Sequence, residues 1–137
     1  MTRKEEKPEL IYKDESFAIV GAYFAVYRDK GRGFLEPVYH QCLEFQGIPL
    51  LSKPPQTLQY RGRTLVQKFS PDFICYDKVI LEIKAVSALI NEHRAQLLNY
   101  LSATDCKLGL LLNSGHYPRL ECERLLPSNQ EPVDLQL

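Results

Sequence analysis

Residues 71–84 read PDFICYDKVILEIK, and they say more about the fold than the rest of the chain does. β-Branched and aromatic side chains fill positions 73–76 and 79–81, which is typical of strands. The polar pair Asp77-Lys78 between them indicates a turn. The segment therefore predicts two antiparallel strands, with Asp72 on one and Glu82 on its neighbour.

The length of this turn decides which side chains share a face of the sheet. Two side chains face the same side when they are directly opposite or an even number of places away. A two-residue turn, residues 77–78, would put Asp72 and Glu82 on opposite faces. A three-residue turn, residues 77–79, pairs Asp72 with Lys84 and puts both on the face of Glu82. We predict the three-residue turn or an equivalent bulge. Four side chains would then face the core: Phe73, Cys75, Leu81 and Ile83.

Two carboxylates on one face of a sheet favour a bound cation. Their oxygens are hard ligands that suit Mg²⁺ or Mn²⁺, which keep several waters and can also bind a substrate phosphate. Lys84 beside them would orient an attacking water or stabilise charge that develops on phosphorus. The spacing alone leaves a second interpretation open, which is an exposed strand that carries Glu and Lys two places apart.

The rest of the chain predicts helices and strands in a simple order. Apolar residues at helical spacing predict a first helix over residues 14–29, with a stripe formed by Phe17, Val20, Phe24 and Tyr27. A glycine-rich turn ends it, and a second helix over residues 37–46 ends at Gly47. A third helix is expected over residues 89–103. Strands are expected over residues 56–60, 64–75 and 79–85, which would form a meander, and over residues 108–113 and 120–125.

Several motifs agree in order and spacing with one known family. They are GFLEPVY (33–39), PD (71–72), EIKAV (82–86), HRAQLLNYL (93–101) and LGLLLN (108–113). Over residues 10–123 the chain resembles the GxxExxY protein family, which belongs to the PD-(D/E)XK nuclease-like superfamily. The resemblance implies an α/β fold with a single-domain restriction-endonuclease-like core, a central mixed β-sheet flanked by helices in the order αα-βββ-α-β-β. This domain would span residues 10–126, between a flexible N-terminal tail (1–9) and a C-terminal tail (127–137).

The resemblance also implies roles at matching positions. Asp72 and Glu82 would be metal ligands, and Lys84 would be the catalytic lysine. Glu36 would supply a third carboxylate to the metal from the helix that precedes the sheet. Its alternative is a helix-start acid stabilised by the helix dipole. The chain departs from the family at Tyr27, where a histidine is usual, so any role of that histidine is in doubt.

A further motif falls on the third predicted helix. Gln96 and Tyr100 resemble the Gln-x-x-x-Tyr motif of RecB-type nucleases, whose side chains lie beside the site. They share one helical stripe and could bind phosphate or the catalytic lysine. His93, three places before Gln96, can join this stripe and contact substrate. The alternatives are an amphipathic boundary for Gln96 and Tyr100, and an ordinary surface histidine for His93.

Composition bounds the functional classes. With 137 residues, the chain is long enough for one domain with a proper core. Lys plus Arg and Asp plus Glu both number 17, and zero net charge is not typical of a protein that coats nucleic acid non-specifically. Residues 53–84 are locally basic, and a bound cation would make them more so, although a solvated mixed-charge face is the alternative. Their basic residues are Lys53, Arg61, Arg63, Lys68, Lys78 and Lys84.

The remaining signals concern compartment and assembly. The four cysteines, at positions 42, 75, 106 and 122, show neither zinc-site spacing nor a disulfide framework. The sequence shows no signal peptide or membrane-length apolar run, so we expect a cytoplasmic protein without membrane contact. Eight Tyr and six Phe, some on the first helix, favour a homodimer.

The sequence therefore predicts a metal-dependent nuclease that hydrolyses phosphodiester bonds, with DNA as its nucleic-acid partner and Mg²⁺ or Mn²⁺ as its cofactor. The alternative, from a different class, is a catalytically inactive nuclease-like binding or assembly module. The intact acidic and lysine positions favour catalysis, because a module without turnover has no need to cluster like charges.

Overall fold

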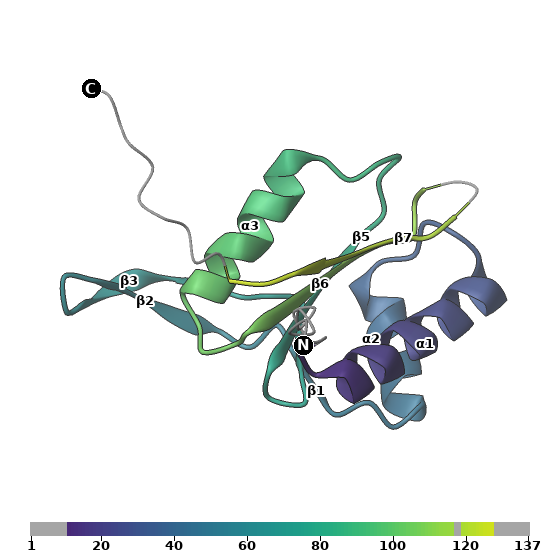
Figure 1. The fold of residues 1–137 in the computed structure, drawn as a ribbon, viewed down its shortest axis with the longest axis horizontal. Coiled ribbons are helices and arrows are strands. Elements are labelled where there is room, and N and C mark those ends of the chain that lie inside the picture. Colours follow the sequence, from purple (N-terminus) through teal and green to yellow (C-terminus); the bar gives the residue numbers. More distant parts are fainter. Residues whose placement is uncertain (1–10, 117–118, 128–137) are drawn as a thin grey trace, which may run out of the picture.

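In a computed structural model of the protein, residues 11–116 and 119–127 are described. The predicted tails lie outside these ranges, apart from residue 127. Helices and strands alternate in blocks along the chain (Figure 1). The elements are α1 (Lys13–Lys30), α2 (Glu36–Phe45), β1 (Leu50–Ser52), β2 (Gln56–Tyr60), β3 (Arg63–Phe69), β4 (Phe73–Cys75), β5 (Val79–Lys84), α3 (Asn91–Ser102), β6 (Leu108–Asn113) and β7 (Glu121–Leu125).

Five strands form one mixed sheet in the order β1-β4-β5-β6-β7. β5 and β6 run parallel, whereas the other neighbours are antiparallel. The crossover between the two parallel strands is α3, which covers one face of the sheet, while α1 and α2 cover the other (Figure 1). β6 is buried along its whole length, as expected for a strand covered on both faces. The predicted α/β core with a mixed sheet between helices is confirmed.

The first helix forms where predicted, but it does not bury the predicted stripe. Phe17 is 60% exposed and Phe24 is 43% exposed. The buried face of α1 lies one step round the helix, and Tyr23 on that face stacks on Tyr39 of α2 with 4.1 Å between ring centroids. The residues of this buried face are Ser16, Ile19, Ala22, Tyr23 and Val26. α1 carries two apolar stripes, and packing against α2 and the sheet selects the one that spacing alone does not favour.

The turn between β4 and β5 has three residues, 76–78, because Cys75 pairs with Val79. The predicted length is confirmed, but the predicted position, residues 77–79, was wrong by one residue. Val79 is fully buried and therefore belongs to the strand. Tyr76 and Asp77 close the turn with φ values of 54° and 59°.

This shift changes the register but not the faces. The predicted pairing of Asp72 with Lys84 was wrong, because the observed register of Phe73 with Leu81 places Asp72 opposite Glu82. A shift of two places leaves every side chain on its predicted face. The four side chains predicted for the core lie in the cluster under α1 and α2, namely Phe73, Cys75, Leu81 and Ile83.

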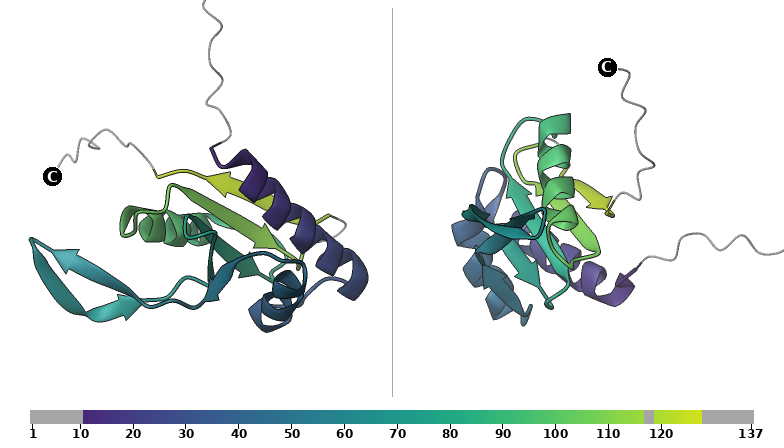
Figure 2. Two further views of the ribbon diagram at one scale, coloured as in Figure 1. Left: turned by 90° about the horizontal axis from the view of Figure 1, so that it is seen from below. Right: turned by 90° about the vertical axis from the view of Figure 1, so that its left-hand side faces the viewer.

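The predicted strand over residues 64–75 is two strands in different sheets, so the predicted meander was wrong. It breaks at Ser70 and Pro71, where proline offers no N–H for a ladder. β2 and β3 form a separate two-stranded sheet that extends from the body of the molecule (Figure 2). The free edge of β4 is instead covered by β1, a three-residue strand that the sequence did not predict.

Within the described residues, no helix has the length and apolar character needed to span a membrane.

Candidate active site

Asp72, Glu82 and Lys84 lie on the face of the sheet that α3 covers. Side chains alternate along a strand, so these three share a face with Ile74 and Ile80. Both isoleucines belong to the core cluster that includes Leu97 and Leu101 of α3. The three polar side chains therefore extend this apolar layer toward the end where β4 begins and β5 finishes.

The two carboxylates hold β4 and β5 together beyond the last backbone pair. Asp72 Oδ2 accepts a hydrogen bond from the Ile83 N–H at 2.9 Å, and Glu82 Oε1 accepts one from the Asp72 N–H at 3.1 Å. The side chains thus replace the main-chain bonds that the strands no longer make. Each carboxylate uses one oxygen in this way, which leaves its second oxygen for a cation or a proton.

The pair is costly to ionise. Glu82 is only 4% exposed, and burial, followed by the charge of Asp72, raises its pKa from the usual 4.5 to about 8. Burial also raises the pKa of Asp72, against the opposing hydrogen bond from Ile83. Two buried carboxylates beside one another favour either a shared proton or a positive ion. Their hard oxygens fit a divalent ion such as Mg²⁺ or Mn²⁺.

Lys84 links this pair to α3. Its Nζ donates a hydrogen bond to Oε1 of Gln96 at 3.1 Å. Tyr100, one helical turn further on, lies near enough that the charges of Glu82 and Asp72, after burial, raise its pKa. Its ring stacks on Phe69 at 4.8 Å. The structure therefore brings Gln96 and Tyr100 to the acidic pair.

Glu36 approaches from the opposite layer, at the N-terminal end of α2. Its charge contributes to the raised pKa of Asp72. Its Oε1 forms an ion pair with Lys53 Nζ at 3.2 Å, and the Lys53 N–H donates to the Asp72 carbonyl at 2.8 Å. Lys53 thus bridges Glu36 and Asp72, a role that the sequence did not suggest.

The described residues contain no group of three or more His, Cys, Asp or Glu side chains gathered around one metal position. Asp72 and Glu82 form the close pair, and Glu36 is engaged by a lysine. This arrangement still suits Mg²⁺, which binds through one or two carboxylates and completes its shell with waters and substrate phosphates.

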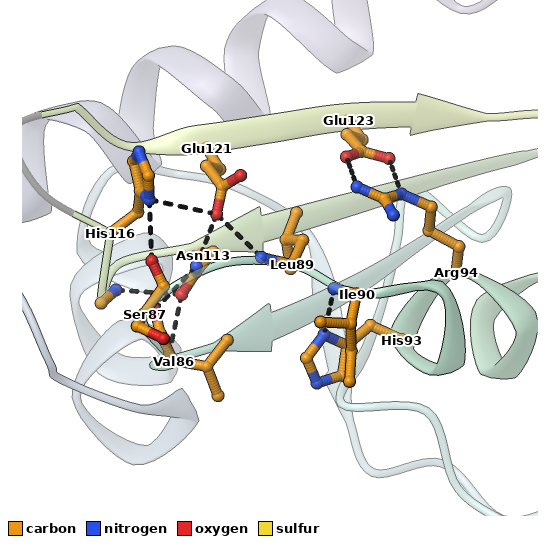
Figure 3. Close-up of polar contacts among 11 residues, drawn as sticks. Val86, Ser87, Leu89, Ile90, His93, Arg94, Asn113, His116, Glu121 and Glu123 are labelled. Carbon is orange, nitrogen blue, oxygen red and sulfur yellow. Dashed lines mark hydrogen bonds and ion pairs between the residues drawn. The ribbon is translucent and has the colours of Figure 1, made fainter.

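His93 is used differently from Gln96 and Tyr100. Its Nδ1 accepts a hydrogen bond from the N–H of Ile90 at 3.1 Å, which caps the start of α3 (Figure 3). The cap gives His93 a structural role. Contact between His93 and substrate stays a prediction.

Comparison with known proteins gives the chain a family. A family model described as the PD-(D/E)XK nuclease superfamily matches residues 13–125. The chain belongs to this superfamily. Membership of the narrower GxxExxY family stays a prediction. One solved structure, described as the crystal structure of SSO0001, matches with a TM-score of 0.53 and 19% sequence identity, over 85% of this chain and 58% of that one. This likeness concerns the fold alone. No curated protein matches the chain.

Residues outside the acidic pair and Lys84 hold this part of the chain in place. Ser114, directly after β6, is completely buried. Its N–H donates to the Lys84 carbonyl at 2.9 Å, and its hydroxyl donates to the Phe34 carbonyl at 2.8 Å. The Gly33 N–H donates in turn to the Ser114 carbonyl at 2.9 Å. Ser114 thus ties the end of β5 to the loop that leads to Glu36.

Asn113 holds the loop between Lys84 and α3 (Figure 3). Its side-chain oxygen accepts from the Val86 N–H at 2.9 Å and from the Gly115 N–H at 3.0 Å. Its amide nitrogen donates to the Val86 carbonyl and to Glu121 Oε1, both at 2.9 Å. Glu121 Oε1 also accepts from the Leu89 N–H at 2.9 Å. All four hydrogen-bonding positions of this buried amide are used.

A charged pair fixes α3 itself. Arg94 Nε and Nη2 donate to the two oxygens of Glu123 on β7 at 2.7 and 2.6 Å (Figure 3). A planar, two-pronged contact of this kind sets both position and orientation. Asn113 and Arg94 lie within motifs that carry the family resemblance, but the sequence predicted no role for either of them or for Glu123.

Proposed function

We propose that this chain is a Mg²⁺- or Mn²⁺-dependent nuclease that hydrolyses phosphodiester bonds in DNA. The observation that carries the proposal is the buried Asp72–Glu82 pair, whose raised pKa values mark a site built at the expense of stability. Membership of a nuclease superfamily supports a nucleic-acid substrate.

The carboxylates would hold the ion. Asp72 and Glu82 each keep one oxygen that makes no main-chain hydrogen bond, and Glu36 would contribute as a third, more distant carboxylate. When bound, a divalent ion polarises the phosphoryl oxygen and lowers the pKa of a bound water. Lys53 keeps Glu36 in reach of Asp72.

Lys84 would place the attacking water and stabilise negative charge on the phosphoryl group. A lysine amine is compact and can rotate, but it needs an anchor to be useful, and Gln96 supplies one at 3.1 Å. Tyr100 and His93 would contact the substrate phosphates along α3. The stripe of three residues would thus guide the strand past the acidic pair.

Cleavage assays separate this proposal from the alternative, a binding or assembly module without turnover. Labelled DNA and RNA are incubated with Mg²⁺ or Mn²⁺, and the parent protein is compared with Glu82→Gln and with a matched control, Glu92→Gln, which removes an exposed carboxylate of α3. We expect DNA cleavage that EDTA abolishes, that Glu82→Gln lowers by more than about a hundredfold, and that Glu92→Gln leaves unchanged. A parent protein that binds DNA but never cleaves it would establish the binding module instead.

A further inference from the structure

The β2–β3 ribbon, residues 56–69, stands out from the body of the molecule (Figures 1 and 2). Several of its apolar side chains are open to solvent, with Val66 99% exposed and Tyr60 59% exposed. A two-stranded ribbon on its own is marginal in water. A projecting ribbon with bare apolar side chains is typical of a surface that meets a partner.

The charge on this segment is entirely positive. Residues 45–71 contain no Asp or Glu, but they contain Lys53, Arg61, Arg63 and Lys68. The whole chain is neutral, so the ribbon concentrates positive charge that the rest of the molecule balances. In the described part of the chain, no carboxylate pairs with Arg61, Arg63 or Lys68. Such a surface attracts a polyanion.

The base of the ribbon reaches the acidic pair. Phe69, the last residue of β3, stacks on Tyr100 with 4.8 Å between ring centroids. Tyr100 lies one helical turn from Gln96, which accepts the hydrogen bond from Lys84 Nζ. A partner that follows the ribbon inward therefore arrives at the candidate active site.

The far end of the ribbon carries two arginines. Tyr60 pairs with Arg63 directly across the ribbon, so these two side chains share a face at the tip. Nearer the base, the register of the ribbon shifts between Thr57 and Gln59. Arg61, in the turn, lies over the Tyr60 ring at 5.3 Å from its centroid. The tip thus presents two guanidinium groups beside an aromatic ring.

We propose that the β2–β3 ribbon is an arm that binds double-stranded DNA beyond the bond to be cleaved. This inference rests on the proposed nuclease function and names its substrate as a duplex. The major groove admits a two-stranded ribbon. Arg61 and Arg63 contact backbone phosphates on either side of that groove, and Phe69 and Tyr100 join the arm to the acidic pair.

Binding without cleavage tests the arm. Fluorescence anisotropy of a labelled DNA duplex is measured in EDTA at several salt concentrations, for the parent and for Arg61→Ala/Arg63→Ala. The matched control is Arg28→Ala/Arg119→Ala, which removes two exposed arginines that line one hollow beside the last turn of α1. That end of α1 lies at the other end of the molecule from the ribbon (Figure 1). We expect the ribbon variant to weaken binding by about tenfold or more and to reduce the slope of log K against log salt by about 2. The control should match the parent.

Further variants and substrates decide the outcome. Arg61→Lys/Arg63→Lys should restore the salt slope, because phosphate contacts need charge. Ribbon variants that bind duplex DNA with the parent's affinity and slope overturn the arm, even if the protein is a nuclease. Stronger binding to single-stranded DNA than to the duplex also overturns it. So does a ribbon variant whose oligomeric state changes, as seen by light scattering, while its DNA binding does not. If the ribbon binds duplex DNA but the protein never cleaves it, the proposed arm stands and the proposed nuclease activity is refuted.

Discussion

Replacing Glu82 by Gln removes one charge from the buried pair while keeping the shape of the side chain. The amide oxygen can still accept the Asp72 N–H, and the amide nitrogen can donate to the Asp72 carboxylate. The Gln side chain therefore imitates a protonated Glu82. We expect the metal-free Glu82→Gln protein to be more stable than the parent in alkaline solution, although the change destroys the metal site.

The magnitude follows from the link between protonation and folding. Burial, followed by the charge of Asp72, raises the pKa of Glu82 from 4.5 to about 8. A carboxyl group with a higher pKa in the folded state holds its proton more tightly there. Its contribution to stability is therefore complete below the unfolded pKa of 4.5 and is lost as the pH rises through about 8. At about 1.4 kcal/mol per pH unit, and less because water enters the site as Glu82 ionises, the parent should lose on the order of 3 kcal/mol across this window.

Urea unfolding in EDTA at a series of pH values measures this loss. The free energy of unfolding of the parent should fall as the pH is raised from acid to alkaline. For Glu82→Gln the fall should be smaller, and the difference between the two proteins should equal the contribution of Glu82. Asp105→Asn, which removes an exposed carboxylate outside the site, is the matched control and should follow the parent. Adding Mg²⁺ or Mn²⁺ should restore stability to the alkaline parent, because the ion binds the ionised pair. It should not restore Glu82→Gln.

One result would refute the reasoning. If the parent and Glu82→Gln proteins lose stability equally as the pH rises, Glu82 is not protonated in the folded protein. The pair would then carry its charges without a cation, and the physical argument for a metal between Asp72 and Glu82 would fail.

Four further variants test the roles of the site residues and of the contacts that support them. Lys84→Arg should keep most metal and DNA binding but lose most cleavage, because a broad planar group cannot place a water as an amine does; cleavage at the parental rate would contradict this. Asp72→Ala should weaken Mn²⁺ binding itself in a calorimetric titration. Ser114→Ala should lower the free energy of unfolding by about 0.5–1.5 kcal/mol, since it removes the hydrogen bond from the Ser114 hydroxyl to the Phe34 carbonyl. Asn113→Leu should cost about 3–5 kcal/mol, because four buried hydrogen bonds are lost; unchanged melting temperatures would contradict both losses.

The sequence predicted faces better than register. Alternation along residues 71–84 depends only on whether the turn has an odd or even number of residues, and every odd turn puts Asp72 and Glu82 on the same side. The position of the turn depends on tertiary contacts. Val79 is drawn into the core, and Lys78 forms an ion pair with Glu15 of α1 at 2.9 Å. Neither contact can be predicted from the residues next to the turn in the sequence.

The strand over residues 56–60 was predicted, but the separation of β2 and β3 from the main sheet and the edge strand β1 were missed for a related reason. A meander is the simplest arrangement of three consecutive strands, and the run of strand-forming residues from 64 to 75 supported it. Pro71 was the available sign of a break, since proline is confined to strand edges and ends. β1 has three residues, too few for any periodic pattern, and exists because β4 offers it an edge.

The candidate site divides in the same way. Residues that a short motif contains, such as Asp72, Glu82 and Lys84, can be recognised by type and spacing. Residues that support them carry no such signal, because their value lies in a contact made across the fold. Lys53 is an example, since it meets both Glu36 and Asp72 only after β1 folds back beside β4.

These supporting contacts explain how one strand end can serve both layers of the molecule. The Lys84 carbonyl accepts a hydrogen bond from the N–H of Ser114, and Ser114 also binds the loop before α2. The Lys84 amine donates a hydrogen bond to Gln96 of α3. The main chain of Lys84 is thus fixed relative to Glu36, while its side chain is fixed relative to Tyr100. A change that shifts α2 or α3 relative to the sheet should therefore displace Lys84 relative to Asp72 and Glu82. Ser114→Ala keeps the N–H that binds the Lys84 carbonyl but removes the hydroxyl that binds the Phe34 carbonyl, so it should loosen the loop before α2 against the end of β5. It should lower cleavage more than it lowers metal binding, because main-chain N–H groups hold the carboxylates of Asp72 and Glu82, whereas the Lys84 amine is held by the side chain of Gln96.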